Sequence, residues 1–277
     1  MKERTYGMKW FSVEIVVLLL ALLFLAPFYF VLANSFKGFA ELLSDTSGLP
    51  KSLDWSNYER AWEVLNFPRA LRNSLLITVF SDLCIIVVSS MAAYRLLRHP
   101  TRINRLLFPL FVAAMVVPFQ AVMIPLVKVG NWLHILNSIP GIILCYTGLG
   151  ASFSIFLYHG FMKSIPLEVE EAAVMDGCNP YGIFWRIVFP LLKPMTVTVI
   201  VLQSLWMWND FLLPLLILQK PELQTIQLAT NSLFGQYLKQ WDLALAALVM
   251  GIVPILAFFL ALQKHVIQGI TAGAVKG

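Results

Sequence analysis

Long apolar runs alternate with short polar segments along most of this chain. Six runs can be placed, at about 12–34, 72–94, 106–128, 139–161, 195–218 and 243–263. Each has the roughly 20 residues with which an α-helix crosses about 30 Å of hydrocarbon, where unpaired backbone groups are too costly to keep. A β-barrel would show shorter segments of alternating polarity instead. The pattern predicts an all-α membrane protein with six transmembrane helices in one domain, residues 1–277.

Composition supports a membrane location. Hydrophobic residues make up 59% of the chain and charged residues only 13%, whereas about a quarter of a soluble domain is charged. Lys2, Arg4 and Lys9 precede the first run as in a secretory signal, but its apolar core is long and no clear cleavage site follows. We therefore expect an uncleaved anchor in a multi-pass protein of a bacterial cell membrane.

The basic residues indicate an orientation. With the N-terminus inside, 12 of the 20 lysines and arginines fall on the cytoplasmic side, where such an excess is normally found. Five of the other eight, from Lys37 to Arg72, lie in or directly after one long outer loop, 35–71, and long loops count little in this rule. Both termini are therefore predicted to be cytoplasmic. The same bias explains the net charge of +5, so we expect no nucleic-acid partner.

Motifs for catalysis and metal binding are absent from the sequence. The four histidines show no ligand spacing and the three cysteines no paired spacing. There is no Gly-x-Ser-x-Gly or His-Glu-x-x-His, which makes an intramembrane enzyme a remote reading, and no Gly-Lys-Ser or Gly-Lys-Thr of an ATP-binding P-loop. We expect no catalytic residue, no metal and no cofactor in this chain, so that energy must come from elsewhere.

Two polar segments are long enough to form structure outside the membrane. In the outer loop, 35–71, the stretch YERAWEVL predicts a helix in a small lid. In the inner loop, 162–194, Pro166 suits a first helical turn and Gly177 the C′ position, which predicts a helix of about eleven residues. Asn179 and Pro180 then read as the cap and first position of a second helix. An isolated helix so short is marginal in water, so we expect a partner to hold it.

A spaced motif occupies this inner loop: Glu-Ala-Ala, three residues, Gly, nine residues, Ile, one residue, an apolar residue and Pro. In it the chain resembles the integral membrane subunit of binding-protein-dependent ABC importers, with Phe189 where that family has Leu. WMWNDFLLPLLIL (206–218) and VIQGITAGAVKG (266–277) are similar to the maltose-type second permease of the carbohydrate-uptake branch. With VPFQAVMIPL (117–126) and NSIPGIIL (137–144), the likeness covers nearly the whole chain.

The resemblance implies a set of partners and a coupling site. The partners are a second permease subunit forming a heterodimer, two ATPase subunits that bind ATP and Mg, and an extracellular or periplasmic sugar-binding protein. The loop helix would dock in a cleft of one ATPase and move with it. The residues so assigned are Glu170, Glu171, Ala172, Ala173, Asp176, Gly177, Ile187 and Pro190. The tail residues Gly273, Lys276 and Gly277 would contact the ATPase dimer.

Polar and aromatic residues within the spans are candidates for a substrate pathway, namely Gln120, Trp206, Asn209 and Asp210. An ionisable residue at such depth must face a cavity or find a partner, so Asp210 fits either a sugar contact or a hydrogen bond between helices. Trp206 fits stacking on a sugar ring or ordinary packing. The residues alone leave these alternatives open.

The predicted function is permeation of a sugar, an oligosaccharide or a sugar derivative, by alternating access driven by partner ATPases. The alternative is an ion-coupled secondary sugar transporter. Such carriers usually have more spans or evident repeats, and ion sites with several buried charges. The five runs that follow the first contain only two acidic residues, Asp82 and Asp210, which favours the ATP-driven reading.

Overall fold

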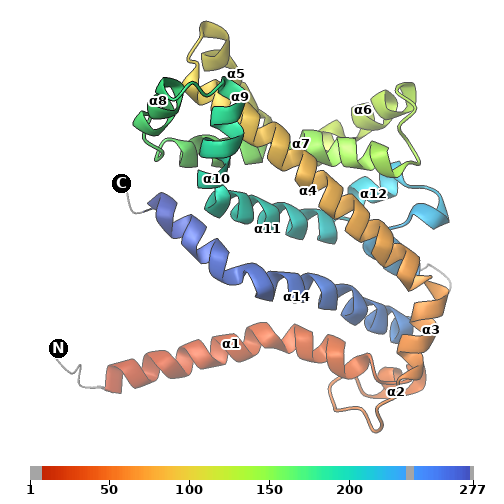
Figure 1. Cartoon of the computed structure of the whole chain (residues 1–277). Coiled ribbons are helices and arrows are strands. Elements are labelled where there is room, and N and C mark those ends of the chain that lie inside the picture. The colour runs from red at the N-terminus through yellow and green to blue at the C-terminus, as the bar shows by residue number, and fades with distance from the viewer. Residues whose placement is uncertain (1–7, 235–239, 275–277) are drawn as a thin grey trace. The chain divides into compact units, whose positions relative to one another are not determined.

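The computed structural model describes residues 8–234 and 240–274, with side chains from residue 11 to residue 263 outside that gap, and it is helical throughout most of these ranges (Figure 1). The elements are α1 (Met8–Asn34), α2 (Phe39–Ser44), α3 (Ser56–Val64), α4 (Phe67–Arg98), α5 (Arg102–Ala114), α6 (Phe119–Trp132), α7 (Ile139–Met162), α8 (Glu168–Met175), α9 (Pro180–Ile183), a π-helical segment (Phe184–Val188), α10 (Phe189–Leu191), α11 (Lys193–Asn209), α12 (Leu212–Ile217), a 3₁₀ turn (Pro221–Leu223), α13 (Ile226–Asn231) and α14 (Trp241–Ala274). They form two compact units, residues 1–67 with 230–252 and residues 68–229 with 253–277. We refer to these as the first and second units.

Four helices in the described part of the chain are long and apolar enough to cross a membrane: α1 from Phe11, α4, α7, and α14 as far as Gln263. Two bent pairs raise the number to six if each pair is one span. The prediction of an all-α membrane fold is thereby confirmed. The exact division of residues 1–277 into spans and loops stays a prediction.

The third predicted run, 106–128, is not one straight helix. It is divided between α5 and α6, whose axes differ by 107°. Pro118 stands at the break with an extended backbone, φ −67° and ψ 141°, and α6 begins directly after it. Proline cannot donate a backbone hydrogen bond and keeps the preceding residue out of the helical region, so the chain turns there.

The fifth predicted run, 195–218, also contains a break. Here α11 ends at Asn209, Asp210 is extended with ψ 132°, and the short helix α12 follows. The Asp210 carboxylate accepts a hydrogen bond from the backbone N–H of Leu212 at 2.9 Å, which satisfies one of the free donors at the start of α12. This bond fixes the turn between the two helices.

The long helix α4 has two distinct faces within the second unit. Positions such as Ile77, Ser81 and Ile85 are buried, whereas Val79 and Leu83 between them are exposed. The spacing of four residues follows the helical repeat, so one whole ridge of α4 packs inward and the opposite ridge faces outward.

The buried face of α4 meets α7 and α11 at small and polar residues. A Cβ on Gly150 of α7 would lie 2.7 Å from Ile85 Cδ1, so a larger residue there would have to displace the end of the Ile85 side chain. Gln203 of α11 donates to the Gly150 carbonyl at 3.2 Å, and Ser204 donates to the Asp82 carboxylate at 2.5 Å. Small residues and side-chain hydrogen bonds of this kind hold helices together where lipid provides no hydrophobic drive. Asp82 is therefore an interhelical hydrogen-bonding group.

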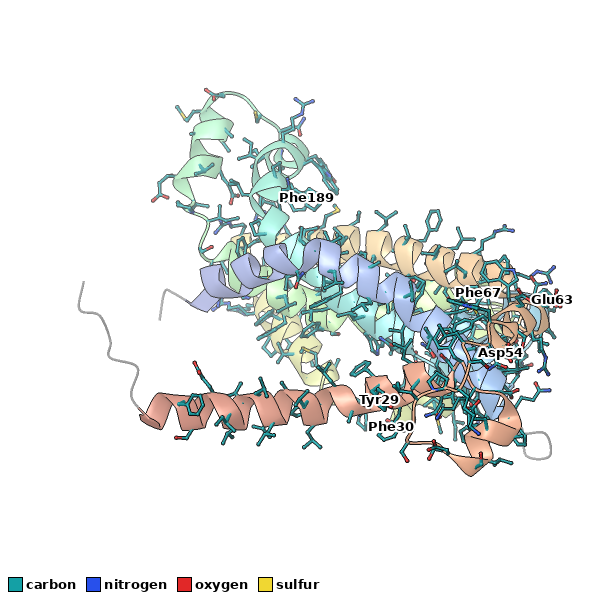
Figure 2. All side chains as sticks on the ribbon, turned by 90° about the horizontal axis from the view of Figure 1, so that it is seen from below. Tyr29, Phe30, Asp54, Glu63, Phe67 and Phe189 are labelled. Atoms are coloured by element: carbon teal, nitrogen blue, oxygen red, sulfur yellow. The ribbon has the colours of Figure 1, made fainter. Side chains whose placement is uncertain are left out.

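The first unit contains the N-terminal helix α1, whose side chains stand out around the whole ribbon (Figure 2). From residue 11 to residue 25 none of its side chains is buried. A helix that is apolar all round and uncovered suits a lipid or a partner surface rather than water.

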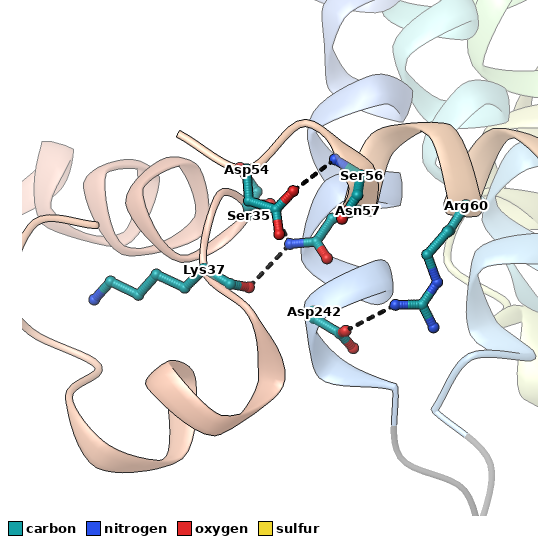
Figure 3. Close-up of polar contacts among 7 residues, drawn as sticks. All are labelled: Ser35, Lys37, Asp54, Ser56, Asn57, Arg60 and Asp242. Carbon is teal, nitrogen blue, oxygen red and sulfur yellow. Dashed lines mark hydrogen bonds and ion pairs between the residues drawn. The ribbon is translucent and has the colours of Figure 1, made fainter. Parts of the chain in front are cut away.

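After α1 the chain closes a loop around one lysine. The side chain of Lys37 is fully buried, and its Nζ donates to the carbonyls of Asp45 at 2.8 Å and Gly48 at 2.7 Å. Asn57 of α3 donates to the carbonyls of Ser35 and Lys37 at 3.0 and 2.9 Å. Figure 3 shows the Asn57 side chain reaching the Lys37 backbone. We call these five residues the Lys37 cage.

The helix predicted in the outer loop is confirmed as α3, because YERAWEVL falls almost entirely within Ser56–Val64, whereas its role as a lid stays a prediction. Asp54 accepts a hydrogen bond from the Ser56 backbone N–H at 2.9 Å, and hydrogen bonds from the Ser56 hydroxyl and from this N–H lower the pKa of that carboxyl. Arg60 of α3 lies 3.7 Å from the Asp242 carboxylate at the start of α14 (Figure 3). This pair is half exposed on the arginine side, so it contributes little to stability.

Candidate functional site

The helix α8 in the loop between α7 and α11 is the centre of the candidate site. It spans Glu168–Met175, eight residues instead of the predicted eleven, because Pro166 and Leu167 precede the helix. Figure 1 shows α8 and α9 close to the end of α4 at which Arg98 lies. The short helix thus depends on its contacts with the rest of the second unit.

The C-terminal end of α8 is closed by a glycine turn. The backbone N–H of Cys178 donates to the Ala173 carbonyl and that of Gly177 to the Val174 carbonyl, both at 3.0 Å. Gly177 has φ +78°, and no atom would lie within 4 Å of a Cβ placed there. These are the two hydrogen bonds of a Schellman motif. The glycine is therefore required for its backbone conformation and not for lack of space, and its predicted C′ position is confirmed.

The two sides of α8 differ in what they contact. Glu170 and Ala173 are buried against the protein, whereas Glu171 and Ala172 are exposed. The exposed side continues into apolar residues, and Met175 is 87% exposed. Of the residues assigned to coupling, only part therefore lies on an accessible surface.

Glu170 attaches α8 to α4. Its Oε1 accepts a hydrogen bond from Arg98 Nε at 2.7 Å, and its Oε2 accepts one from the Tyr94 hydroxyl at 2.8 Å. Arg98 also donates to the Ile165 carbonyl at 3.0 Å, just before α8. Both carboxylate oxygens are satisfied and the side chain is only 8% exposed. We call Glu170, Arg98 and Tyr94 the Glu170 anchor.

The anchor was not found by sequence reasoning, which treated Glu170 as a partner contact like Glu171. Arg98 was counted only as one of the basic residues at the inner end of a span. The signal that was available is the position of Tyr94 and Arg98 four residues apart, on one side of the last turns of α4. As long as the anchor stays closed, both oxygens of the Glu170 carboxylate are occupied by these two residues.

Residues 179–192 lead from α8 to α11, and we call this bent segment the elbow. Asn179 caps α9 by accepting from the Gly182 backbone N–H at 2.8 Å, as predicted, and Pro180 follows at the first position. The helix then widens into the π-helical segment before Pro190 and bends by 73° into α11. A proline removes one backbone donor, which a π-helical turn accommodates by shifting the hydrogen bonds.

The elbow is packed against α4 by an aromatic contact. The rings of Phe184 and Tyr94 lie with their centroids 5.2 Å apart, and Phe184 is buried. Ile187 and Phe189 are half-buried and pack against the same core. The predicted apolar role of Ile187 and Phe189 is consistent with this packing, while Pro190 itself is exposed.

Of the four pathway candidates, Trp206 and Asp210 both contact Tyr146 of α7. Gln120 is exposed at the start of α6, and the Asn209 side chain donates to the Leu205 carbonyl of its own helix at 2.7 Å. Asp210 accepts from the Tyr146 hydroxyl of α7 at 3.0 Å as well as from Leu212, which gives it a structural role. Trp206 packs edge-on against Tyr146. Their contact with a substrate stays a prediction.

The remaining candidates concern the C-terminus and metals. Gly273 belongs to the last turn of α14, whereas Lys276 and Gly277 lie outside the described residues. Among the residues that the structure describes, no cluster of three or more His, Cys, Asp or Glu side chains is placed to hold a metal ion.

Comparisons with known proteins identify relatives over most of the chain. Residues 85–272 match the family model described as "binding-protein-dependent transport system inner membrane component". The chain is 44% identical over 259 residues to the probable starch degradation products transport system permease protein AmyC of Thermoanaerobacterium thermosulfurigenes, covering 94% of each chain. It is 36% identical over 270 residues to the melibiose/raffinose/stachyose import permease protein MelC of Bacillus subtilis, covering 96% of this chain and 98% of that one.

A solved structure shares the fold. It belongs to a bacterial ABC transporter involved in the import of the acidic polysaccharide alginate, with a TM-score of 0.80 and 25% sequence identity. The match covers 95% of this chain and 99% of the other.

Proposed function

Because the chain belongs to the family of binding-protein-dependent transport system inner membrane components, we propose that it is the permease subunit of an ATP-driven importer of oligosaccharides. Relatives named for starch degradation products and for melibiose, raffinose and stachyose support this class of cargo. The chain has no P-loop, so ATP and Mg bind in separate ATPase subunits. A second permease and a sugar-binding protein complete the transporter.

The observation that carries the coupling proposal is the two-sided helix α8. Its inner side is fixed to α4 through Glu170, Arg98 and Tyr94, while its outer side presents Glu171 and Ala172 without a covering element. A partner that binds the outer side moves α8, and the Glu170 anchor passes that movement to a helix long enough to span the membrane. Residues Ala172, Gly177 and Asp176 shape the docking side; Ile187 and Pro190 shape the elbow.

The orientation follows from the basic residues. Arg95, Arg98, Arg102 and Arg105 gather around the α4–α5 connection, Lys163 and Arg186 lie between α7 and α11, and Lys193 is the first residue of α11. Such residues are retained in the cytoplasm. We therefore infer that α8, both termini and the tail residues Gly273, Lys276 and Gly277 face the ATPases.

Sugar uptake in reconstituted complexes tests the proposal. Glu171→Ala removes an exposed carboxylate from the docking side of α8, and we expect uptake to fall at least about tenfold, the effect of losing one charged contact of roughly 1.5–3 kcal/mol. Glu168→Ala is the matched control, because Glu168 is also an exposed glutamate of α8 but does not belong to the predicted coupling residues. Assembly with the ATPases is measured in parallel by co-purification.

Gly177→Ala provides a second, conformational test of the same site. An L-residue at φ +78° costs roughly 1 kcal/mol, so we expect a few-fold loss of uptake with the complex still assembled. Undiminished uptake in both the Glu171→Ala and the Gly177→Ala transporter would contradict coupling through α8.

The ion-coupled alternative makes a different prediction. A secondary transporter loses uptake when an ionophore dissipates the gradient and keeps it when ATP is removed. We expect the reverse in proteoliposomes that contain the chain together with its ATPases. Uptake that survives the removal of ATP but not the ionophore contradicts the proposal.

A further inference from the structure

A cavity of about 180 Å³ lies in the second unit beside the Glu170 anchor. It is lined on α4 by Met91, Tyr94, Arg95 and His99, and on the elbow by Pro180, Tyr181 and Phe184. Phe184 is its buried lining residue, and we call the exposed Arg95 and His99 its basic rim. None of the seven lining residues is acidic.

The basic rim has not been neutralised by neighbours within the described residues. The Arg98 guanidinium donates hydrogen bonds to Glu170 and to the Ile165 carbonyl, and the Tyr94 hydroxyl also donates to Glu170. The Arg95 side chain, in contrast, is exposed and forms neither an ion pair nor a hydrogen bond with any described residue. A free guanidinium beside an aromatic cavity attracts an anion that can accept two hydrogen bonds.

The position of this rim is fixed by the end of α4. Asn104 of α5 is buried, and its side-chain amide donates to the carbonyls of Arg95 at 3.3 Å and His99 at 2.6 Å. The Arg95 carbonyl belongs to the last turn of α4, and the His99 carbonyl directly follows the helix; they also accept from the backbone N–H groups of His99 at 3.2 Å and of Thr101 at 2.8 Å. Arg95 and His99 are thereby held at a constant place relative to the cavity.

An apolar ridge leads along α4 to the cavity. At intervals of four residues the exposed positions are Leu75, Val79, Leu83, Val87 and Met91, and the next two positions in the same row are Arg95 and His99. The row covers about 24 Å from Leu75 to Met91 at 1.5 Å per residue. Its apolar part lies in the hydrocarbon depth of a helix that spans the membrane, so its basic end lies at the headgroup level.

Aromatic side chains mark the same level from the elbow side. Tyr181 is 73% exposed and Trp185 is 39% exposed, next to the buried Phe184. Tyrosine and tryptophan with one wet edge are enriched where hydrocarbon gives way to headgroups. The cavity therefore opens at the boundary between the two.

We propose that this cavity binds one anionic phospholipid, with its phosphate on Arg95 and His99 and an acyl chain along the ridge from Met91 to Val87. A basic pocket at the end of a transmembrane helix suits this kind of ligand. A free phosphate uses the rim but not the ridge, which is why the lipid is the better fit. Lipid bound here contacts both α4 and the elbow, and so stabilises the side of α4 from which Tyr94 holds Glu170.

The inference requires only that α4 spans a bilayer and does not depend on which partner binds α8. Lipid binding and the uptake effect of Glu171→Ala can therefore fail independently. Either result leaves the other interpretable.

Native mass spectrometry of the purified chain from nanodiscs tests the site. The discs contain either phosphatidylcholine alone or an equal mixture with phosphatidylglycerol, and we count the phosphatidylglycerol molecules retained by the chain. Arg95→Gln is expected to lower the retained phosphatidylglycerol about fivefold, because one basic group near the surface changes anionic lipid binding by that factor. Arg95→Lys is expected to keep most of it.

Arg102→Gln is the matched control, because Arg102 is an exposed arginine at the same end of the helices but does not line the cavity. Equal retention in the Arg95→Gln and Arg102→Gln chains overturns the proposal. Glycerol phosphate in solution is added as a competitor at the concentration of the lipid headgroup. Displacement of the lipid by this competitor also overturns it, since the site is then one for a soluble anion.

Discussion

The Lys37 cage in the first unit and the Glu170 anchor in the second hold a buried charge by different means. The Lys37 ammonium donates to two backbone carbonyls that are only 8 and 11 residues further along the chain. The Glu170 carboxylate is held by side chains 72 and 76 residues away, from Arg98 and Tyr94. One charge is satisfied by its own loop, and the other by a distant helix.

Because of this difference, the two regions should respond differently to force. A loop that satisfies its lysine internally has a low closure cost and needs no other element to keep its shape. A helix held by a distant ion pair cannot move without moving its partner or breaking the pair. We therefore interpret the Lys37 cage as a rigid platform and the Glu170 anchor as a mechanical connection.

Removal of the buried lysine has the largest expected effect. Lys37→Met leaves the carbonyls of Asp45 and Gly48 without a donor, at a cost of roughly 3 kcal/mol in the free energy of unfolding of this loop. We expect faster hydrogen exchange and proteolysis between residues 35 and 58, measured on the purified chain in detergent micelles.

Lys51→Met is the control for Lys37→Met, because Lys51 belongs to the same loop but is exposed. Its exchange and proteolysis should match those of the unmodified chain. If the two variants behave alike, the cage is not what holds the loop, and the comparison with the anchor fails.

The second prediction concerns the strength of the anchor. In a double-mutant cycle of Arg98→Gln and Glu170→Gln, we expect a coupling energy of roughly 2 kcal/mol, because both side chains are largely buried and 2.7 Å apart. Thermal unfolding of the purified chain provides the four free energies. A coupling energy near zero shows that the pair is dispensable for holding α8.

The fold could be predicted from the sequence because the signals that indicate it are local. Runs of apolar residues predict spans, Gly177 predicts the end of α8, and Asn179 with Pro180 predicts the start of α9. Each of these depends on neighbours within a few positions, and backbone geometry alone decides them. The bend at Pro118 follows from the same local rule.

The contacts of the candidate site could not be read in this way. Glu170 and Glu171 are adjacent and chemically identical, yet one is buried and the other exposed. Which of them faces α4 depends on how the loop returns from α7. No local spacing rule indicates a contact between Arg98 and Glu170, which are 72 residues apart. The cage was missed for another reason, since the burial of Lys37 contradicts the usual preference of lysine for the surface.

A smaller effect is expected from the second partner in the anchor. Tyr94→Phe removes one hydroxyl donor from Glu170 but leaves the ion pair with Arg98 and the contact with Phe184. We expect a loss of roughly 1–2 kcal/mol in the free energy of unfolding, less than for the Arg98→Gln chain. Equal losses in the two variants indicate that the hydroxyl, and not the ion pair, fixes α8. Tyr58→Phe is a suitable control, because Tyr58 is a tyrosine of the first unit whose hydroxyl bonds Ser35 and not the anchor.

The smallest predicted effect is a response of the cage to acid. Asp45 accepts hydrogen bonds from the backbone N–H groups of Gly48 and Ser47 at 2.8 and 3.0 Å, and these bonds, Gly48 first, lower the pKa of the carboxyl below its ordinary value of 3.8. A lowered folded-state pKa means that the stabilising contribution is complete above pH 3.8 and is lost as the pH falls through the folded value. Protection of the Ser47 and Gly48 amides from hydrogen exchange, corrected for intrinsic rates, should therefore be constant from neutral pH to about pH 5 and decline only below about pH 4. In Asp45→Asn the same amides should show no such decline, since the amide side chain does not titrate. Loss of protection already near pH 6 in the unmodified chain would mean that a group other than Asp45 controls this turn, and that the loop is less self-sufficient than the backbone contacts of Lys37 imply.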